Sequence, residues 1–276
     1  MPSAIEKRQT YRKLHDSGCF VLPNPWDIGS ARYLQSLGFK ALASTSAGYA
    51  FTLGWPDNAV GLEGMLLHLR DLCAATDLPV NADFENGYAH EPDGVAQNVT
   101  LCIATGVAGL SIEDSTGDKD KPLYELDHAV ARIRAARAAI DRRGGDTILT
   151  GRAECFLVGK PDLDETIKRL KAYADAGADC LYSPGIRTPE QIAAVVKAVA
   201  PKPFNFLMTN YALKTPEIAA LGVRRISTGG TLARVAYGAM LKSARQILAD
   251  GNFGSFADAV PHPEINGFFR EDMKKR

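Results

Sequence analysis

The chain of 276 residues is long for one ordinary domain, although α/β barrels often reach this length as a single unit. Its 32 basic and 32 acidic residues balance, so net charge gives no reason to expect a nucleic-acid or membrane-surface partner, and we expect a small-molecule ligand. The five cysteines lack any C-x-x-C spacing, which argues against a disulfide framework or a zinc site and favours a reducing, cytoplasmic location.

The N-terminal segment is charged and has no apolar core of the kind that a secretion signal carries. No run of the sequence approaches the ~18 apolar residues of a membrane span, so we expect a soluble, unprocessed protein. A first helix is predicted from about 4 to 17, with Ile5, Tyr11 and Leu14 as its inner face. A second helix is predicted over 28–36, after the turn at Pro25.

Glycines end several predicted helices shortly before an apolar strand begins. Glycine adopts the left-handed cap conformation at no steric cost, so each such position indicates a helix-to-strand joint of a parallel sheet. The joints are Gly38, Gly106, Gly177 and Gly222.

Eight short apolar strands follow this pattern, and crossover helices such as 129–140 and 163–175 fit between them. Eight βα units in a chain of this size predict a (β/α)₈ barrel. An open doubly wound sheet is the alternative, but no G-x-G-x-x-G turn follows the first strand. The strands are expected near 20–23, 41–46, 79–84, 109–113, 147–152, 180–183, 203–208 and 224–228.

No linker divides the chain, so we predict one barrel domain over 1–276 with a C-terminal helical tail from about 241 to 276. Four phenylalanines stand in that tail among Gly, Pro and charged residues. We expect them to pack on a neighbouring subunit or on the flank of the barrel. They are Phe253, Phe256, Phe268 and Phe269.

Acidic side chains gather where two of the predicted strands end. Asp83 and Glu85 are two residues apart, so on a strand both would point to the same face, and Glu113 ends the next strand. The carboxyl ends of parallel strands meet at one mouth, where three carboxylates would suit Mg²⁺ or Mn²⁺. The alternative is that these acids are solvated loop residues or helix caps.

Polar side chains from other strand ends would complete this mouth. Arg152 would need a charged partner if buried, and that partner is either a structural acid or a substrate carboxylate, which suggests a small oxo-acid ligand. The turn after the second strand offers hydroxyl and amide groups to an anion, although it could be an ordinary turn. The candidate ligand-binding residues are Ser44, Thr45, Ser46, Trp26, Asn205 and Arg152.

Other catalytic patterns find little support. Cys155 lies near Arg152 but has no histidine placed to activate it, and a buried cysteine is usually inert packing. The five histidines are scattered, so neither a Ser/His/Asp triad nor a histidine metal site can be assembled from them. No lysine lies at a predicted strand end, which disfavours a Schiff-base aldolase.

Several motifs together resemble the isocitrate lyase and phosphoenolpyruvate mutase superfamily between about residues 20 and 240. The pieces Ala-Asp-Phe-Glu-Asn-Gly-Tyr at 82–88 and Ile-Glu-Asp at 112–114, in this order, are fairly specific. The others are Asn-Pro-Trp-Asp at 24–27, Ser-Thr-Ser at 44–46, Gly-Trp-Pro-Asp at 54–57, Gly-Arg at 151–152 and Ala-Gly-Ala-Asp at 176–179.

This resemblance implies a (β/α)₈ barrel whose last helix is exchanged between subunits of a homodimer or homotetramer. It implies Mg²⁺ held directly or through water, a 2-oxo-acid substrate bound through its carboxylate and ketone oxygens, and substrate contacts from Arg152 and Ser44 with its neighbouring amides. The implied metal residues are Asp57, Asp83, Glu85 and Glu113, and Asp57, Glu113 and Arg152 are the candidate catalytic residues.

The loop after the fourth strand departs from the superfamily. Isocitrate and methylisocitrate lyases carry Lys-x-Cys-Gly-His there, whereas segment 115–124 has neither cysteine nor histidine. The asparagine of the phosphonomutase loop is absent too, and the region of Pro184 replaces that enzyme's histidine after strand six. We therefore expect Mg²⁺-dependent C–C cleavage, of decarboxylase or lyase type, of an oxaloacetate-like acid. The alternatives are a phosphoenolpyruvate or phosphonopyruvate mutase or hydrolase, and a barrel that binds a 2-oxo-acid without turning it over.

Overall fold

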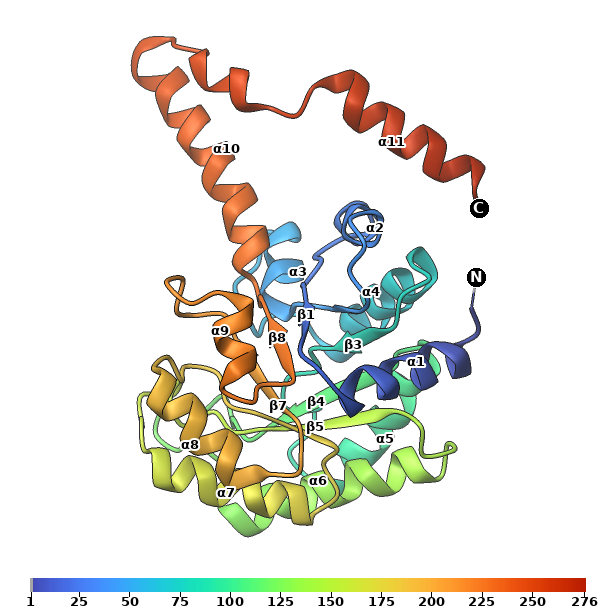
Figure 1. Ribbon diagram of the computed structural model, residues 1–276, viewed down its shortest axis with the longest axis vertical. Helices are drawn as coiled ribbons and strands as arrows, with labels where there is room; N and C mark the ends of the chain where they lie inside the picture. Colours follow the sequence, from blue (N-terminus) through green and yellow to red (C-terminus); the bar gives the residue numbers. More distant parts are fainter. Residues whose placement is uncertain (1) are drawn as a thin grey trace. The chain divides into compact units, whose positions relative to one another are not determined.

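The computed structural model describes residues 2–276, and the chain divides into two compact units. The first unit ends at Leu232 and contains eight parallel strands with helices between them (Figure 1). The strands are β1 (Phe20–Leu22), β2 (Leu42–Ala43), β3 (Val80–Ala82), β4 (Gly109–Glu113), β5 (Ile148–Arg152), β6 (Cys180–Tyr182), β7 (Phe204–Leu207) and β8 (Arg225–Ser227).

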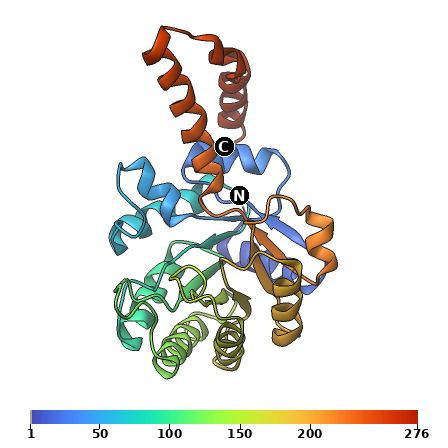
Figure 2. The ribbon, with the colours of Figure 1, turned by 90° about the vertical axis from the view of Figure 1, so that its left-hand side faces the viewer.

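The helices of the first unit surround these strands, as the view in Figure 2 also shows. Among the described residues, none of the helices is both long enough and apolar enough to cross a membrane. The helices are α1 (Ala4–Asp16), α2 (Ile28–Ser36), α3 (Ser46–Thr52), α4 (Leu62–Ala75), α5 (Pro92–Ala104), α6 (Leu126–Asp141), α7 (Leu163–Asp175), α8 (Pro189–Val199) and α9 (Thr215–Ala220).

The strand order is β1-β8-β7-β6-β5-β4-β3-β2, and every pair is parallel. A backbone hydrogen bond of 3.1 Å from Ala43 N to Pro23 O links the two ends of this order, next to β1 and β2. The predicted (β/α)₈ barrel is confirmed, and each strand lies within its expected range. Most strands are shorter than expected. For example, Ser46 begins α3 because the Thr45 hydroxyl accepts a hydrogen bond from Gly48 N and caps that helix.

The prediction for the inner face of α1 is wrong at Ile5, which is 57% exposed, and right at Tyr11, which is fully buried. Polar side chains occupy much of the buried face instead. Lys7 Nζ donates to the carbonyls of Cys73 and Thr76, where α4 ends. The last carbonyls of a helix have no partner within the helix, so Lys7 satisfies two of them, while Tyr11 and Leu14 pack in an apolar cluster.

The second unit, Ala233–Arg276, contains most of α10 (Thr231–Asp250), a short 3₁₀ helix (Gly254–Asp258) and α11 (His262–Lys274). Phe253 and Phe256 stack edge-to-face at 5.6 Å and are each more than half exposed. The expectation that the tail aromatics pack on a neighbouring subunit or on the barrel stays a prediction.

Gly109→Ala is expected to destabilise the barrel by about 1–3 kcal/mol, because a Cβ there would lie 2.7 Å from both Asn81 Oδ1 and Tyr11 Cε1 in a packed interior. Urea unfolding measures the change. Gly238→Ala is the matched control, since its Cβ in α10 meets no atom within 4 Å, and alanine is the better helix former. Equal unfolding midpoints for Gly109→Ala and the wild type would contradict this packing.

Candidate active site

A hollow of about 640 Å³ opens beside the carboxyl ends of β3, β4 and β5. Its charged lining consists of four acids and Arg152. Asp57 reaches it from the loop between α3 and α4, and Ser115, Thr116 and Gly117 reach it from the loop after β4. The charged residues are Asp57, Glu85, Glu113, Glu154 and Arg152.

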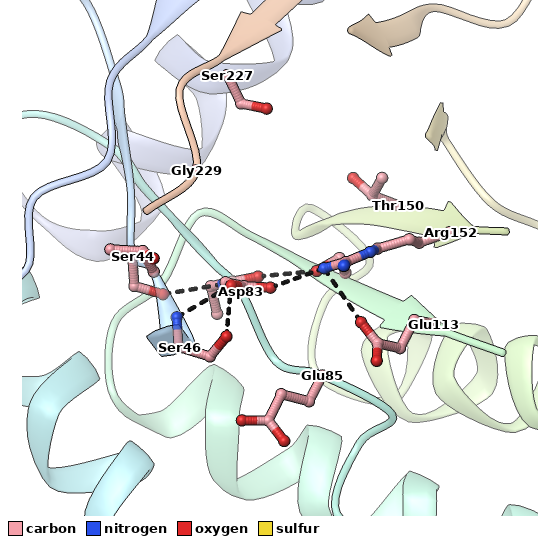
Figure 3. Close-up of polar contacts among 12 residues, drawn as sticks. Ser44, Ser46, Asp83, Glu85, Glu113, Thr150, Arg152, Ser227 and Gly229 are labelled. Atoms are coloured by element: carbon pink, nitrogen blue, oxygen red, sulfur yellow. Dashed lines mark hydrogen bonds and ion pairs between the residues drawn. The ribbon is translucent and has the colours of Figure 1, made fainter. Parts of the chain in front are cut away.

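Asp83 stands at the centre of the polar network, directly after β3 (Figure 3). Its backbone N donates to Ser44 Oγ at 2.9 Å, which fixes the turn. Its Oδ2 accepts from the backbone N and the hydroxyl of Ser46, at 3.0 and 2.9 Å. Ser44 and Ser46 therefore hold Asp83 in place, and Ser46 also lines the hollow.

Arg152 lies among three carboxylates because the β4–β5 register pairs it with Glu113. Its Nη1 is 3.1 Å from both Asp83 Oδ1 and Glu113 Oε2 (Figure 3). Its Nε donates to Glu154 Oε1 at 2.5 Å. Arg152 thus has structural acids as partners and also faces the hollow. Both partners considered from the sequence, a structural acid and a ligand carboxylate, therefore remain open to it.

Glu85 reaches the hollow by a different route from the one that strand alternation predicts. The strand β3 ends at Ala82, and Glu85 has a left-handed φ of 47° in the turn that follows. Tyr88 OH donates to Glu85 Oε1 at 3.0 Å, and Asn98 Nδ2 donates to the carbonyl oxygens of Gly87 and Tyr88. The turn therefore aims the carboxylate, and the side-chain alternation of a strand does not.

The carboxyl groups of the hollow hold their protons more tightly than free carboxyl groups do. Burial, reinforced by the charges of Asp83 and Asp57, raises the pKa of Glu85 to about 7. Burial raises the pKa of Asp57 as well, again with Asp83 adding to the effect. Burial also raises the pKa of Glu113, against the opposing charge of Arg152. One guanidinium does not balance the negative charges around it.

Four predicted ligand-binding residues do not line the hollow: Ser44, Thr45, Trp26 and Asn205. Thr45 is buried as the cap of α3, and Trp26 is half-buried. Asn205 lies in the barrel interior, where its Oδ1 accepts from Arg225 Nε and its Nδ2 donates to Ser227 Oγ. Asn205 lines a separate cavity of about 50 Å³, together with Ser44, Asp83 and Arg152.

Two acids were missing from the predicted site. Glu154 is buried and holds Arg152, and its position two residues after Arg152 at a strand end was the available signal. Asp114 is buried and stabilises the fold around the site: its Oδ2 accepts from Arg169 Nη1 and Tyr173 OH, and its Oδ1 accepts from Glu154 N.

Cys155 is buried, and burial raises the pKa of its thiol, which agrees with an inert packing role. The loop after β4 closes on itself through an antiparallel bridge between Ser115 and Leu123. Its lysines, Lys119 and Lys121, are exposed. This small closed loop contributes Ser115, Thr116 and Gly117 to the lining of the hollow.

Comparison with known proteins places this geometry in context. The family model described as phosphoenolpyruvate phosphomutase matches residues 11–248. A solved structure from Burkholderia cenocepacia J2315, described only as a lyase/mutase, is 48% identical, with a TM-score of 0.95 and 97% of each chain covered.

Two relatives with named activities are more distant. An oxaloacetate decarboxylase of Paraburkholderia xenovorans (strain LB400) is 30% identical over 203 residues, which cover 70% of this chain and 66% of the relative. The structure of a phosphonopyruvate hydrolase in complex with oxalate and Mg²⁺ is 27% identical, with a TM-score of 0.84 and 97% of each chain covered. With its eight-stranded barrel and its acidic hollow, the chain belongs to the phosphoenolpyruvate phosphomutase family, within the isocitrate lyase and phosphoenolpyruvate mutase superfamily.

Proposed function

We propose that this protein is a Mg²⁺-dependent carbon–carbon lyase, of decarboxylase type, that acts on a small dicarboxylic 2-oxo or 2-hydroxy acid similar to oxaloacetate. The observation that carries the proposal is the position of Arg152, the cation among the described residues lining the hollow, next to an excess of carboxylates. An arginine recognises a carboxylate with two parallel hydrogen bonds, and the excess of acids attracts a hard cation.

The residues of the hollow fit Mg²⁺. They offer carboxylate oxygens, which this ion prefers, and burial, reinforced by mutual repulsion, raises the pKa values of Asp57, Glu85 and Glu113. A divalent ion would relieve that repulsion. Mn²⁺ has similar preferences. The residues that would hold the ion are Asp57, Glu85 and Glu113, which line the hollow, and Asp83, which shares the Ser46 hydroxyl with Asp57.

When bound, the ion would stabilise the negative charge that develops on the ketone oxygen of the substrate as the bond breaks. Arg152 would bind a substrate carboxylate and add a second positive charge. Glu154 would keep the guanidinium oriented through its hydrogen bond to Nε. Ser46, whose amide and hydroxyl fix Asp83, would hold that carboxylate at the hollow.

The loop after β4 would close over the hollow and exclude water from the bound acid. It supplies Thr116 and Gly117 to the lining, but no thiol or imidazole that could act as a general acid. Decarboxylation fits this lining because bond breaking by that route needs no protonated group at the start.

The similarity to a phosphonopyruvate hydrolase favours a second candidate function, the hydrolysis or rearrangement of a phosphono-oxo-acid. The third possibility is a barrel that binds a 2-oxo-acid without turnover. Assembly as a homodimer or homotetramer, with exchange of the last helix, is the expectation for each of them.

A turnover screen tests the proposal. Oxaloacetate, 2-oxoglutarate, isocitrate, methylisocitrate and phosphonopyruvate are each incubated with enzyme in Mg²⁺ and in EDTA, and compared with the same mixtures lacking enzyme, because Mg²⁺ alone promotes loss of CO₂ from oxaloacetate. We expect a dicarboxylate to be consumed only with enzyme and Mg²⁺. Asp83→Ala should lower kcat/KM at least about 100-fold, since it removes a carboxylate that would hold the ion and that contacts Arg152.

Asp71→Ala is the control for that variant, because Asp71 is an exposed acid on α4 away from the hollow. Consumption of phosphonopyruvate instead would establish the second candidate. Thermal stabilisation by one acid without consumption would establish the binding barrel. Full turnover by Asp83→Ala would show that the hollow is not the active site.

Glu85→Gln is expected to change how stability depends on pH. The pKa of Glu85 rises from 4.5 to about 7 on folding, so the folded state binds more protons than the unfolded state between these values. Stability from this group is therefore present at pH 4.5 and is lost as the pH rises to 7, a loss of about 3 kcal/mol.

Thermal melts from pH 5 to 8 in EDTA should show the Tm of the wild type falling relative to that of Glu85→Gln. Added Mg²⁺ should raise the Tm of the wild type at pH 8 more than that of the variant, because it compensates the ionised carboxylate. Parallel Tm profiles in EDTA would contradict the assigned burial and repulsion.

A further inference from the structure

Two histidines and a glutamate come together outside the active-site hollow. His90 and Glu91 directly precede α5, and His128 lies in the first turn of α6. Each offers one ligand atom, and the three atoms lie within 4.8 Å of one another. The two histidines are 38 residues apart in the sequence, so the expectation that no histidine metal site forms missed a contact made by the fold.

One ring nitrogen of each imidazole already has a hydrogen-bond partner. His128 Nε2 lies 3.0 Å from the carbonyl oxygen of His90. A carbonyl only accepts, so Nε2 carries the proton and Nδ1 of His128 keeps its lone pair. His90 Nδ1 lies 3.2 Å from Tyr124 OH, and with Nδ1 as the donor, Nε2 of His90 keeps its lone pair, 3.9 Å from Glu91 Oε1.

This is the arrangement that metal-binding histidines usually have, in which the other ring N–H donates to a fixed acceptor and sets the tautomer. The acceptors here are themselves held in place. Arg132, which is almost fully buried, donates from Nη1 to the same His90 oxygen at 3.1 Å, and its guanidinium lies 3.9 Å from the centre of the Tyr124 ring. The three rings of His90, Tyr124 and His128 are 5.0–5.2 Å apart.

An ion can reach this cluster from solvent. The side chains of His90 and Glu91 are 68% and 73% exposed, and both histidines line an open hollow of about 680 Å³. Asp118 and Glu125 line the same hollow and add negative charge against Lys121. The open side leaves room for the water molecules that would complete the coordination of an ion with three protein ligands.

We propose that His90, Glu91 and His128 form a second metal site, selective for a divalent transition-metal ion of the Zn²⁺ class. Two imidazoles and one carboxylate suit Zn²⁺, Co²⁺ or Ni²⁺, whereas the all-oxygen acids of the active-site hollow suit Mg²⁺. The two sites therefore differ in ligand chemistry, and the imidazole nitrogens favour a transition-metal ion over Mg²⁺ at the histidine site. A bound ion would join the start of α5 to the start of α6, next to Tyr124 at the end of the loop that lines the active-site hollow.

Metal titration of the full chain tests the proposal. The protein is stripped with EDTA, transferred to excess Mg²⁺ and titrated with Zn²⁺ by calorimetry and with Co²⁺ by visible absorption. We expect His90→Ala and His128→Ala each to bind one Zn²⁺ fewer than the wild type and to lose the Co²⁺ bands of nitrogen coordination. Glu91→Gln, which keeps the shape and removes the charge, should weaken Zn²⁺ binding at least about 10-fold.

His262→Ala is the matched control, because His262 is an exposed histidine at the start of α11, outside the cluster. The difference between variants isolates this site even if Zn²⁺ also enters the active-site hollow. The same Zn²⁺ stoichiometry in the wild type and His128→Ala, or a loss of one site in His262→Ala as well, would overturn the proposal. So would the absence of saturable Co²⁺ bands in the wild type.

Discussion

The contact on which the rest of the site depends is the one between the Arg152 guanidinium and the carboxylates of Asp83, Glu113 and Glu154. A buried guanidinium is costly unless its N–H groups and its charge have partners. These carboxylates come from the ends of β3, β4 and β5, and the pairing of Glu113 with Arg152 in the β4–β5 ladder sets the spacing of those two residues. Because a slip of one residue turns every side chain to the other face, the register of the barrel and the charge pattern of the hollow specify each other.

The other end of the barrel interior is built around a second arginine with a different kind of partner. Arg225 is fully buried and donates to Asn205, Thr150 and Tyr11, all of which are neutral. Burial and the charge of Arg225 lower the pKa of His15 to about 3, so this histidine stays neutral too. The barrel thus has a cation without acids at one end and an excess of acids at the other. A further positive charge would therefore be stabilised at the acidic end and not at the end that holds Arg225.

The eight strands could be predicted because the signal is local: an apolar run beside a glycine that caps a helix. Because the carboxyl ends of parallel strands lie at one end of the barrel, the proximity of Asp83, Glu113 and Arg152 was also predicted correctly. What failed depended on contacts between distant segments. Ile5 is exposed, whereas Lys7 on the same helix is buried against the carbonyls at the end of α4. The direction of the Glu85 side chain is set by a left-handed turn. Asn205 accepts a hydrogen bond from Arg225 in the barrel interior instead of lining the hollow. The position of a residue on its strand does not by itself specify how deep in the barrel its side chain lies.

The small cavity beneath Arg152 bears on how that side chain can exchange partners. It measures about 50 Å³ and is lined by polar groups, among them Ser44, Asn81 and Ser111, so it has both the room and the hydrogen-bonding groups that an internal water molecule requires. With a water molecule there, the guanidinium would keep part of its solvation when one carboxylate contact opens. Under the proposed function, Arg152 would then pass from a protein carboxylate to a substrate carboxylate without an intermediate state in which its charge lacks hydration.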